Sequence, residues 1–237
     1  MGSVRTSEKE EATSVIELSG ESSVHILRNW FSYSEHDFEN LWSKRPKEAQ
    51  HVVIFGKRFE VKRRQAFYVS KEIRGKIASY NFSGSSVPSR SIEDEALLSR
   101  ALSCVRKHAS KTFGKVWGDG LNAVFVNWYA EGDKIGEHSD DEKCLVANSP
   151  IYSVTMQPSS TTRRVFRIKP KRKRKRKGSS PLVSCNAQPK EKLDISLAGG
   201  DLLIMCGHFQ NEFTHQVPFR KTTDKGIRIN LTIRAFK

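Results

Sequence analysis

Two residues that can bind a metal ion, His138 and Asp140, stand on either side of Ser139, just after a glycine-containing turn. In extended backbone, side chains two positions apart project to the same side, so this imidazole and this carboxylate can reach one cation. A histidine followed two positions later by an aspartate also arises by chance, and alone it is weak support for a site. A metal site therefore requires a third ligand and a matching polar face elsewhere in the chain.

Residues 228–234 supply a polar face, because polar and apolar side chains alternate strictly along them. Such alternation predicts a β-strand with one polar side, formed by Arg228, Asn230, Thr232 and Arg234. A guanidinium group binds a carboxylate through two parallel hydrogen bonds, so this side suits a small anionic molecule. The structural alternative is an edge strand whose polar side meets water. His215, upstream of this strand, is available as a third metal ligand.

A second alternating run, from Leu121 to Tyr129, places Asn127 and Tyr129 on one face. Together with the two motifs above, this run resembles the AlkB-type Fe(II)- and 2-oxoglutarate-dependent dioxygenases, which repair alkylated nucleobases. The resemblance extends from about Val53 to Phe236, and the eukaryotic branch that repairs duplex DNA is the most similar. It implies a mainly β fold with flanking helices (α+β), in which a double-stranded β-helix, or jelly roll, carries an N-terminal nucleotide-recognition lid.

The resemblance also implies the roles of the site residues. Fe(II) would be held, and catalysis performed, by His138, Asp140 and His215. The cosubstrate 2-oxoglutarate would be bound by Asn127, Tyr129, Arg228, Asn230, Thr232 and Arg234. With O2, such a site would oxidise the N-methyl group of bases such as 1-methyladenine and 3-methylcytosine in DNA. Succinate, carbon dioxide and formaldehyde would be released, and the base would be restored.

Nucleic acid contacts are expected from the lid and from the loop after the metal motif. The residues concerned are Phe55, Gly56, Lys57, Arg63, Gln65, Tyr80, Phe82, Ser83, Asp141 and Glu142. By resemblance, Phe55 would fill the gap left by an extruded base, although the residues alone favour an ordinary core aromatic. Phe82 would stack on the flipped base, and Glu142 would favour cationic bases. A solvated loop acid is the alternative for Glu142.

Two other classes of function remain open. A non-catalytic nucleic-acid-binding protein would account for the basic charge and the aromatic residues, but not for three metal ligands beside an arginine-lined face. A 2-oxoglutarate oxygenase acting on a substrate other than nucleic acid would keep the metal and cosubstrate motifs. Within the same family, RNA is the alternative to DNA.

The charge of the 237-residue chain points to a polyanionic partner, since the formal net charge is +15. Eight of the basic residues lie between Lys169 and Lys177. This tract is expected to be a solvated loop that serves nuclear import, phosphate contact or both, with a merely solubilising loop as the alternative. We expect a nuclear protein that acts as a monomer on alkylated DNA in duplex form.

The organisation of the chain is expected to be a disordered tail over residues 1–22, helices and the lid over 23–115, and the catalytic core over 116–237 with a basic loop at 169–190. Low hydrophobic content, 37%, supports unfolded segments. No apolar run approaches the length of a membrane span, and the residues after Met1 do not show the charged, apolar and small-residue pattern of a secretory leader, so neither a membrane span nor secretion is expected. The four cysteines are scattered and are expected to be free thiols.

Local signals predict the elements that must position these residues. Ser34 and Asp37 form a capping-box pattern at the start of a short helix, and Ser91 is predicted to cap a second helix ending near Lys111. Residues 51–61 are predicted to form a hairpin around Gly56. The core strands are predicted at 121–129, 151–157, 163–169, 193–197, 201–206, 215–218 and 228–235.

Overall fold

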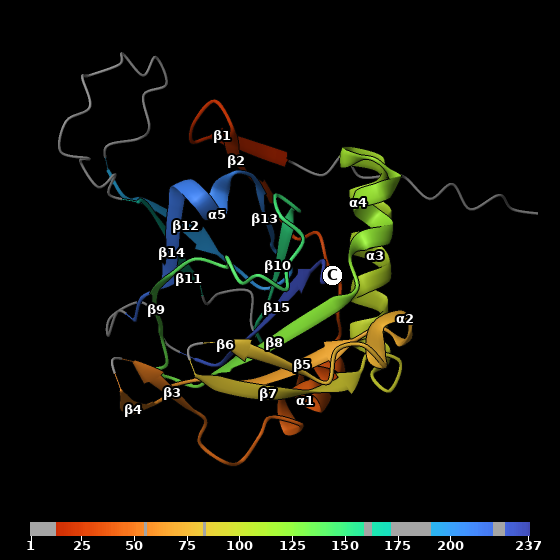
Figure 1. Cartoon of the computed structure of the whole chain (residues 1–237), viewed down its shortest axis with the longest axis vertical. Helices are drawn as coiled ribbons and strands as arrows, with labels where there is room; N and C mark the ends of the chain where they lie inside the picture. The colour runs from red at the N-terminus through yellow and green to blue at the C-terminus, as the bar shows by residue number, and fades with distance from the viewer. Residues whose placement is uncertain (1–12, 55, 83, 159–162, 172–190, 220–225) are drawn as a thin grey trace, which may run out of the picture.

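The computed structural model describes residues 13–54, 56–82, 84–158, 163–171, 191–219 and 226–237. Two sheets face one another, with a long helix along the outer side of the larger one (Figure 1). This arrangement confirms the predicted mainly β fold with a jelly-roll core and flanking helices. Phe55, Ser83, residues 1–12 and most of the basic tract lie outside the described residues.

The larger sheet joins the N-terminal segment to the core in one continuous layer. In spatial order its nine strands are β1 (Thr13–Glu17), β2 (Ser22–Leu27), β13 (Leu202–Gly207), β10 (Ile151–Met156), β15 (Arg228–Arg234), β8 (Ala123–Tyr129), β5 (Arg64–Val69), β7 (Ser85–Ser91) and β6 (Ser79–Phe82). Strands from residues 23–115 therefore pair directly with strands from 116–237. The lid and the core share a sheet.

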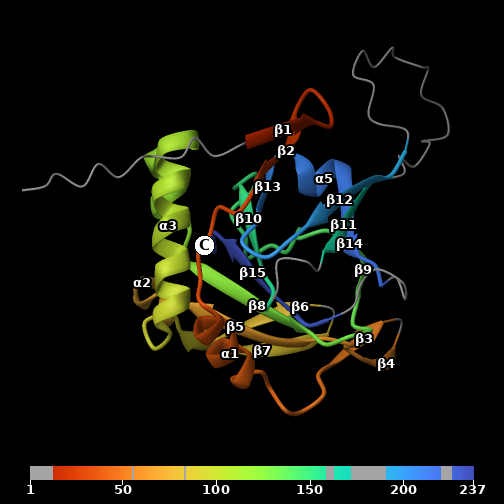
Figure 2. The same ribbon diagram turned by 180° about the vertical axis from the view of Figure 1, so that it is seen from behind.

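The smaller sheet carries the metal-ligand motif. Its strands, in spatial order, are β12 (Leu193–Leu197), β11 (Arg164–Pro170), β14 (Phe213–Val217) and β9 (Ile135–His138). The predicted hairpin forms a separate pair, β3 (His51–Ile54) and β4 (Lys57–Glu60). Both views place this hairpin and β9 on the same side of the molecule (Figures 1 and 2).

The strands β8 and β15 are buried on both faces. Alternate side chains of each strand therefore point either into the main hydrophobic cluster or toward the smaller sheet. Val124, Val126 and Trp128 of β8 pack in the main hydrophobic cluster, as do the alternate apolar residues of β15. The helix α3 (Ala96–Phe113) contributes Leu98, Ala101, Leu102, Val105 and Ala109 to that cluster. The opposite side of each strand is free to face the interior between the two sheets.

Four shorter helices complete the described fold. They are α1 (Glu35–Ser43), α2 (Lys71–Arg74), α4 (Lys115–Gly120) and α5 (Phe209–Glu212). The predicted capping box of α1 is confirmed, because the Ser34 hydroxyl accepts from the Asp37 amide and the Asp37 carboxylate accepts from the Ser34 amide. No helix among the described residues is both long enough and apolar enough to cross a membrane.

Two local predictions are wrong. Residues Thr13–Glu17, expected within a disordered tail, form the edge strand β1, because their backbone pairs in register with the neighbouring β2 despite mostly exposed side chains. Ser91 does not cap α3: it ends β7, the Ile92 amide still donates to the carbonyl of Val69, and the helix begins only at Ala96. The Ser91 hydroxyl donates instead to the Glu93 carboxylate.

The β6–β7 turn closes against the hairpin at Gly84, which has a φ of +69°. A Cβ atom added there would lie 3.0 Å from the Cβ of Val53, so a side chain would crowd the neighbouring strand. The two parts of the lid are thereby held in contact. Cys104, Cys144 and Cys206 are free thiols, as predicted, and Cys185 lies outside the described residues.

Candidate metal and cosubstrate site

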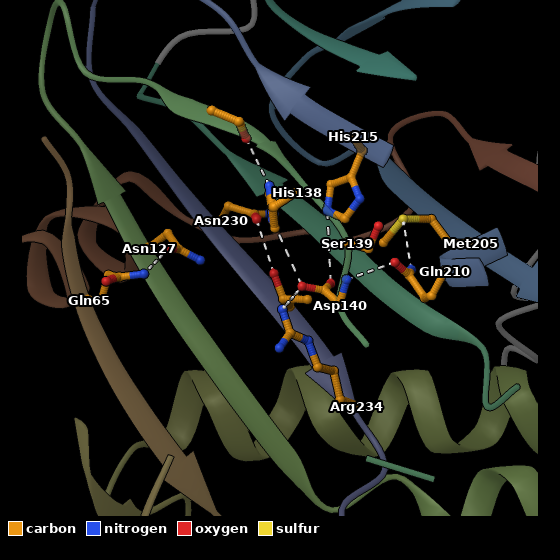
Figure 3. Close-up of polar contacts among 12 residues, drawn as sticks. Gln65, Asn127, His138, Ser139, Asp140, Met205, Gln210, His215, Asn230 and Arg234 are labelled. Atoms are coloured by element: carbon orange, nitrogen blue, oxygen red, sulfur yellow. Dashed lines mark hydrogen bonds and ion pairs between the residues drawn. The ribbon is translucent and has the colours of Figure 1, made fainter. Parts of the chain in front are cut away.

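The three predicted metal ligands meet at one end of the smaller sheet. His138 of β9 stands directly opposite His215 of β14 in the strand register, and Asp140 follows two residues after His138. The ligand atoms of the three side chains all lie within 4.8 Å of one another. The two rings lie with centroids 4.2 Å apart, and each imidazole Nε2 is 3.8 Å from one oxygen of the Asp140 carboxylate (Figure 3). Two imidazoles and one carboxylate on one side suit Fe(II) with open positions left for other ligands.

Neighbouring groups hold the three side chains in place. The His138 Nδ1–H donates to the carbonyl of Gly136 at 2.9 Å, which leaves the lone pair of Nε2 toward Asp140. The Asp140 amide donates to the side-chain oxygen of Gln210 at 2.9 Å (Figure 3). The ring of Phe166 stacks on His215 with centroids 5.2 Å apart. The site is therefore oriented before any metal binds.

The protonation states match what a divalent cation requires. Burial lowers the pKa of His215 to about 3, with the adjacent His138 acting in the same direction. Burial also lowers the pKa of His138. Burial by itself raises the pKa of the Asp140 carboxyl, but Arg234 and the two imidazoles outweigh it, so the pKa lies below its usual value. At neutral pH the site offers neutral imidazoles and an ionised carboxylate.

The predicted cosubstrate residues share one wall of the same cavity because of the pairing of β8 with β15. The register places Arg228 opposite Tyr129 and Asn230 opposite Asn127. The cavity is lined by these four residues together with Arg63, Gln65, Tyr80, Phe125, Ile135, His138, Asp140, Glu142, Ser153, Phe166, Met205, His215, Val217, Thr232 and Arg234. Metal ligands and cosubstrate residues therefore face one space, although they come from different sheets.

Arg228 is suited to hold a carboxylate at the inner end of this wall. Its side chain is 1% exposed, and among the described residues its Nε and Nη1 have no hydrogen-bond partner. Its Nη2 donates to the hydroxyl of Thr155 at 3.1 Å, and its guanidinium lies 5.2 Å from the ring centroid of Tyr129. Burial lowers the pKa of Arg228 to about 10. A buried cation with unused donors fits the far carboxylate of 2-oxoglutarate.

The amide and hydroxyl groups of the wall support one another. The Asn230 amide nitrogen donates to the Ser153 hydroxyl and to the carbonyl of Val154, both at 2.9 Å. The Thr232 hydroxyl donates to the Asn230 side-chain oxygen at 3.2 Å. Arg63 reaches in from the lid, and its Nε donates to the side-chain oxygen of Asn127 at 2.8 Å. The Gln65 amide also contacts that oxygen, at 3.1 Å.

Arg234 connects the metal ligands to the lid. Its Nη2 lies 2.9 Å from a carboxylate oxygen of Asp140, and its Nη1 donates to the hydroxyl of Tyr80 at 2.8 Å. Burial raises the pKa of the Tyr80 hydroxyl, so Tyr80 remains protonated at neutral pH. Its ring meets Phe125 edge to face. Tyr80 is thus a buried wall of the cavity.

The other residues predicted to contact nucleic acid do not lie together in the structure. Glu142 lines the cavity, whereas Asp141 is exposed and lies 3.4 Å from the ammonium group of Lys171, outside the cavity lining. Gly56 and Lys57 lie at the exposed end of the hairpin. Phe82 lies in β6, and its side chain is not described; Phe55 and Ser83 lie outside the described residues.

Sequence reasoning missed two residues beside the site. Arg164, at the start of β11, is 1% exposed, and its guanidinium lies 6.0 Å from the ring centroid of Tyr129. Its signal was present, since Arg164 alternates with Phe166 and Ile168 along the strand. Gln210 sits in a helix of one turn, where no sequence pattern marks it.

Comparison with known proteins agrees with this geometry. A family model described as the 2OG-Fe(II) oxygenase superfamily matches residues 23–234. The DNA oxidative demethylase ALKBH2 of Homo sapiens is 30% identical over 210 residues, which cover 85% of this chain and 70% of the human protein. Its Mus musculus counterpart is 32% identical over 184 residues, covering 77% and 65%. The alkB homolog 3 of Rattus norvegicus is 31% identical over 118 residues, covering 49% and 36%.

A solved structure, described as that of OsALKBH1, shares the fold with a TM-score of 0.50 at 15% sequence identity, covering 90% of this chain and 96% of that one. The cofactor Fe(II) and the cosubstrates 2-oxoglutarate and O2 follow from the family, and the cavity described above has the groups to hold Fe(II) and 2-oxoglutarate. This chain belongs to the 2OG-Fe(II) oxygenase superfamily and is an AlkB-type dioxygenase.

Proposed function

We propose that this protein is a DNA oxidative demethylase that repairs N-alkylated bases of the 1-methyladenine and 3-methylcytosine type by direct reversal. His138, Asp140 and His215 would hold Fe(II), while Arg228 and Tyr129 would bind the far carboxylate of 2-oxoglutarate. When bound there, Fe(II) and 2-oxoglutarate would, together with O2, supply the oxidation of an N-methyl carbon, with succinate, carbon dioxide and formaldehyde as products. The relatives named as DNA oxidative demethylases support this assignment.

The placement of Glu142 is the observation that carries the proposed substrate. Glu142 shares the cavity with the metal ligands, and its Oε2 is buried without a hydrogen-bond partner among the described residues. A buried carboxylate oxygen without a partner favours a positively charged or hydrogen-donating ligand. The bases 1-methyladenine and 3-methylcytosine carry a positive charge at neutral pH and present an amino group, so they match this wall.

The lid supports a nucleic acid substrate in duplex form. In the hairpin, every residue of β4 is exposed, and Lys57 and Arg58 lie there beside the neighbouring Lys62. Such a surface attracts phosphates. In the sequence, Phe55 immediately precedes Gly56, which has a φ of +74° between β3 and β4. An apolar residue at such a turn can fill the space left by an extruded base, and thus lower the cost of unstacking.

The first prediction concerns Glu142. Changing Glu142→Gln removes the charge and keeps the shape, so repair of cationic 1-methyladenine should slow by about tenfold or more. Repair of 3-methylthymine, which is neutral, should change much less. Both rates are measured as base recovery from matched single- and double-stranded DNA and RNA oligonucleotides with Fe(II) and 2-oxoglutarate. Equal losses on the two bases would remove Glu142 as a determinant of substrate charge.

The second prediction concerns Phe55. Phe55→Ala should slow repair in a duplex by roughly tenfold to a hundredfold, and leave repair of a single strand nearly unchanged, because a single strand has little to unstack. Phe59→Ala serves as the matched control, since it removes an aromatic that is 48% exposed in the same hairpin without altering its turn. A matched loss on both substrates with a lower melting temperature would identify Phe55 as a packing residue.

The same oligonucleotide set decides between DNA and RNA. Faster repair of methylated RNA than of either DNA form would replace the proposed substrate by RNA. No repair of any oligonucleotide, with 2-oxoglutarate still consumed, would favour an oxygenase acting outside nucleic acids. We further propose that the protein acts in the nucleus and as a monomer.

A further inference from the structure

Arg164 is a buried cation to which the established motifs assign no role. It shares one side of β11 with Phe166 and Ile168, which pack between the sheets, and Phe166 reaches the metal ligand His215. The Arg164 Nη2 donates to the carbonyl of Asp133 at 2.6 Å. Its guanidinium lies 6.0 Å from the ring centroid of Tyr129. Arg164 therefore lies beside Tyr129, and it is not among the residues that line the cavity.

Two buried guanidinium groups contact the same aromatic ring. Arg228 approaches Tyr129 at 5.2 Å from β15, and Arg164 approaches it from the opposite sheet. Their mutual repulsion adds to burial in lowering the pKa of Arg228. Placing two cations together in a protein interior costs free energy unless negative charge offsets it.

Among the described residues, Asp133 is an acidic group close to Arg164. The Asp133 carboxylate already accepts the backbone N–H of Ala130, and it also faces Arg64. Burial raises the pKa of Asp133. Of the two arginines, Arg228 is the one that lines the cavity, and its Nε and Nη1 have no partner within the described part of the chain. An anion bound there would feel both positive charges.

We propose that Arg164 is a positioning residue for 2-oxoglutarate, which strengthens the hold of Arg228 on the far carboxylate through its charge and through the Tyr129 ring. Its effect is selectivity: a dianionic 2-oxo acid gains from the second cation, whereas a 2-oxo acid without the far carboxylate does not. The inference rests on the cosubstrate of the family and not on the proposed nucleic acid substrate. Its test therefore needs no repair reaction.

The test uses Arg164→Gln, which keeps an amide donor for the Asp133 carbonyl and removes the charge. Binding of 2-oxoglutarate and of 2-oxopentanoate is measured by calorimetry on the Mn(II)-loaded protein without turnover. Both acids chelate the metal, and only the first has the far carboxylate. We expect the affinity for 2-oxoglutarate to fall by about tenfold and that for 2-oxopentanoate to stay within about twofold.

Two further variants complete the experiment. Arg164→Lys restores a positive charge and should recover most of the affinity for 2-oxoglutarate. Arg167→Met removes an arginine from the other side of β11, where it pairs with Asp194, and should change neither affinity. An equal loss for both acids in Arg164→Gln, or failure of Arg164→Lys to recover binding, would overturn the proposal and make Arg164 a structural support. Unchanged binding of 2-oxoglutarate would overturn it as well.

Discussion

At the scale of single residues, the contrast between Asp140 and Asp141 shows how narrowly the site is defined. Asp140 is buried beside two imidazoles and Arg234, whereas the adjacent Asp141 is exposed and contacts Lys171. The alternation of side chains after β9 turns one carboxylate inward and the next outward. The two residues have the same chemistry, and their surroundings alone separate their roles.

The third prediction follows from that contrast. Asp140→Asn should weaken Mn(II) binding by about a hundredfold or more, because an amide replaces the only charged ligand of the set. Asp141→Asn, the matched control, should change it by less than about threefold, since an exposed ion pair contributes little. Titration of the metal-free protein with Mn(II) measures both. Similar affinities for the two variants would place the metal elsewhere.

At the scale of elements, the short helix α5 connects the metal ligands to the end of β11. Gln210 accepts the amide N–H of Asp140 through its side chain, and its own backbone carbonyl accepts the ammonium group of Lys171 at 2.7 Å. Lys171 also pairs with Asp141. Gln210 of this one-turn helix thus contacts Asp140 directly, and it contacts Asp141 indirectly through Lys171.

The fourth prediction concerns this helix. Gln210→Ala leaves the Asp140 amide without its partner and should weaken Mn(II) binding by about tenfold, as loss of a group that orients a ligand does. Asn211→Ala, at the exposed next position, is the control and should have no effect. Circular dichroism checks that both variants stay folded. A normal Mn(II) affinity in Gln210→Ala would show that the strand pairing of β9 with β14 suffices.

At the scale of the whole molecule, the basic tract is joined to the core by its first residues. Lys169 pairs with Glu137 at 2.8 Å, and Lys171 is tied to Asp141 and to the carbonyl of Gln210. Removing the entire tract would therefore also disturb the segment around the metal ligands. Lys169 and Lys171 make these contacts, so changing residues 172–177 alone keeps both side chains in place.

The fifth prediction uses that division. Replacing residues 172–177 with Gly and Ser should flatten the salt dependence of DNA binding, by about 0.9 in the logarithmic slope for each phosphate that the tract no longer neutralises. It should also reduce nuclear accumulation, while 2-oxoglutarate affinity stays unchanged. Replacing only Lys169 and Lys171 is the matched control, and should weaken Mn(II) binding instead. Unaltered slope and localisation would leave solubility as the role of the tract.

The sequence by itself determined the faces of the strands that carry the site. The alternation in β8 and β15 predicted which side chains point to the core and which to the cavity, because that period is a local property of extended backbone. The capping box of α1 and the hairpin turn at Gly56 were also predictable, since each depends on residues a few positions apart.

Only the tertiary structure decided how these faces meet. The strand β1 forms because the neighbouring β2, which is itself paired with the distant β13, offers its backbone partners, and Ser91 remains in a strand because β5 lies beside it. Arg164 and Gln210 acquire their positions near Tyr129 and Asp140 from contacts across 35 and 70 residues of chain. Pairing and packing between segments that far apart depend on the whole fold, whereas composition and spacing report only on neighbours along the chain.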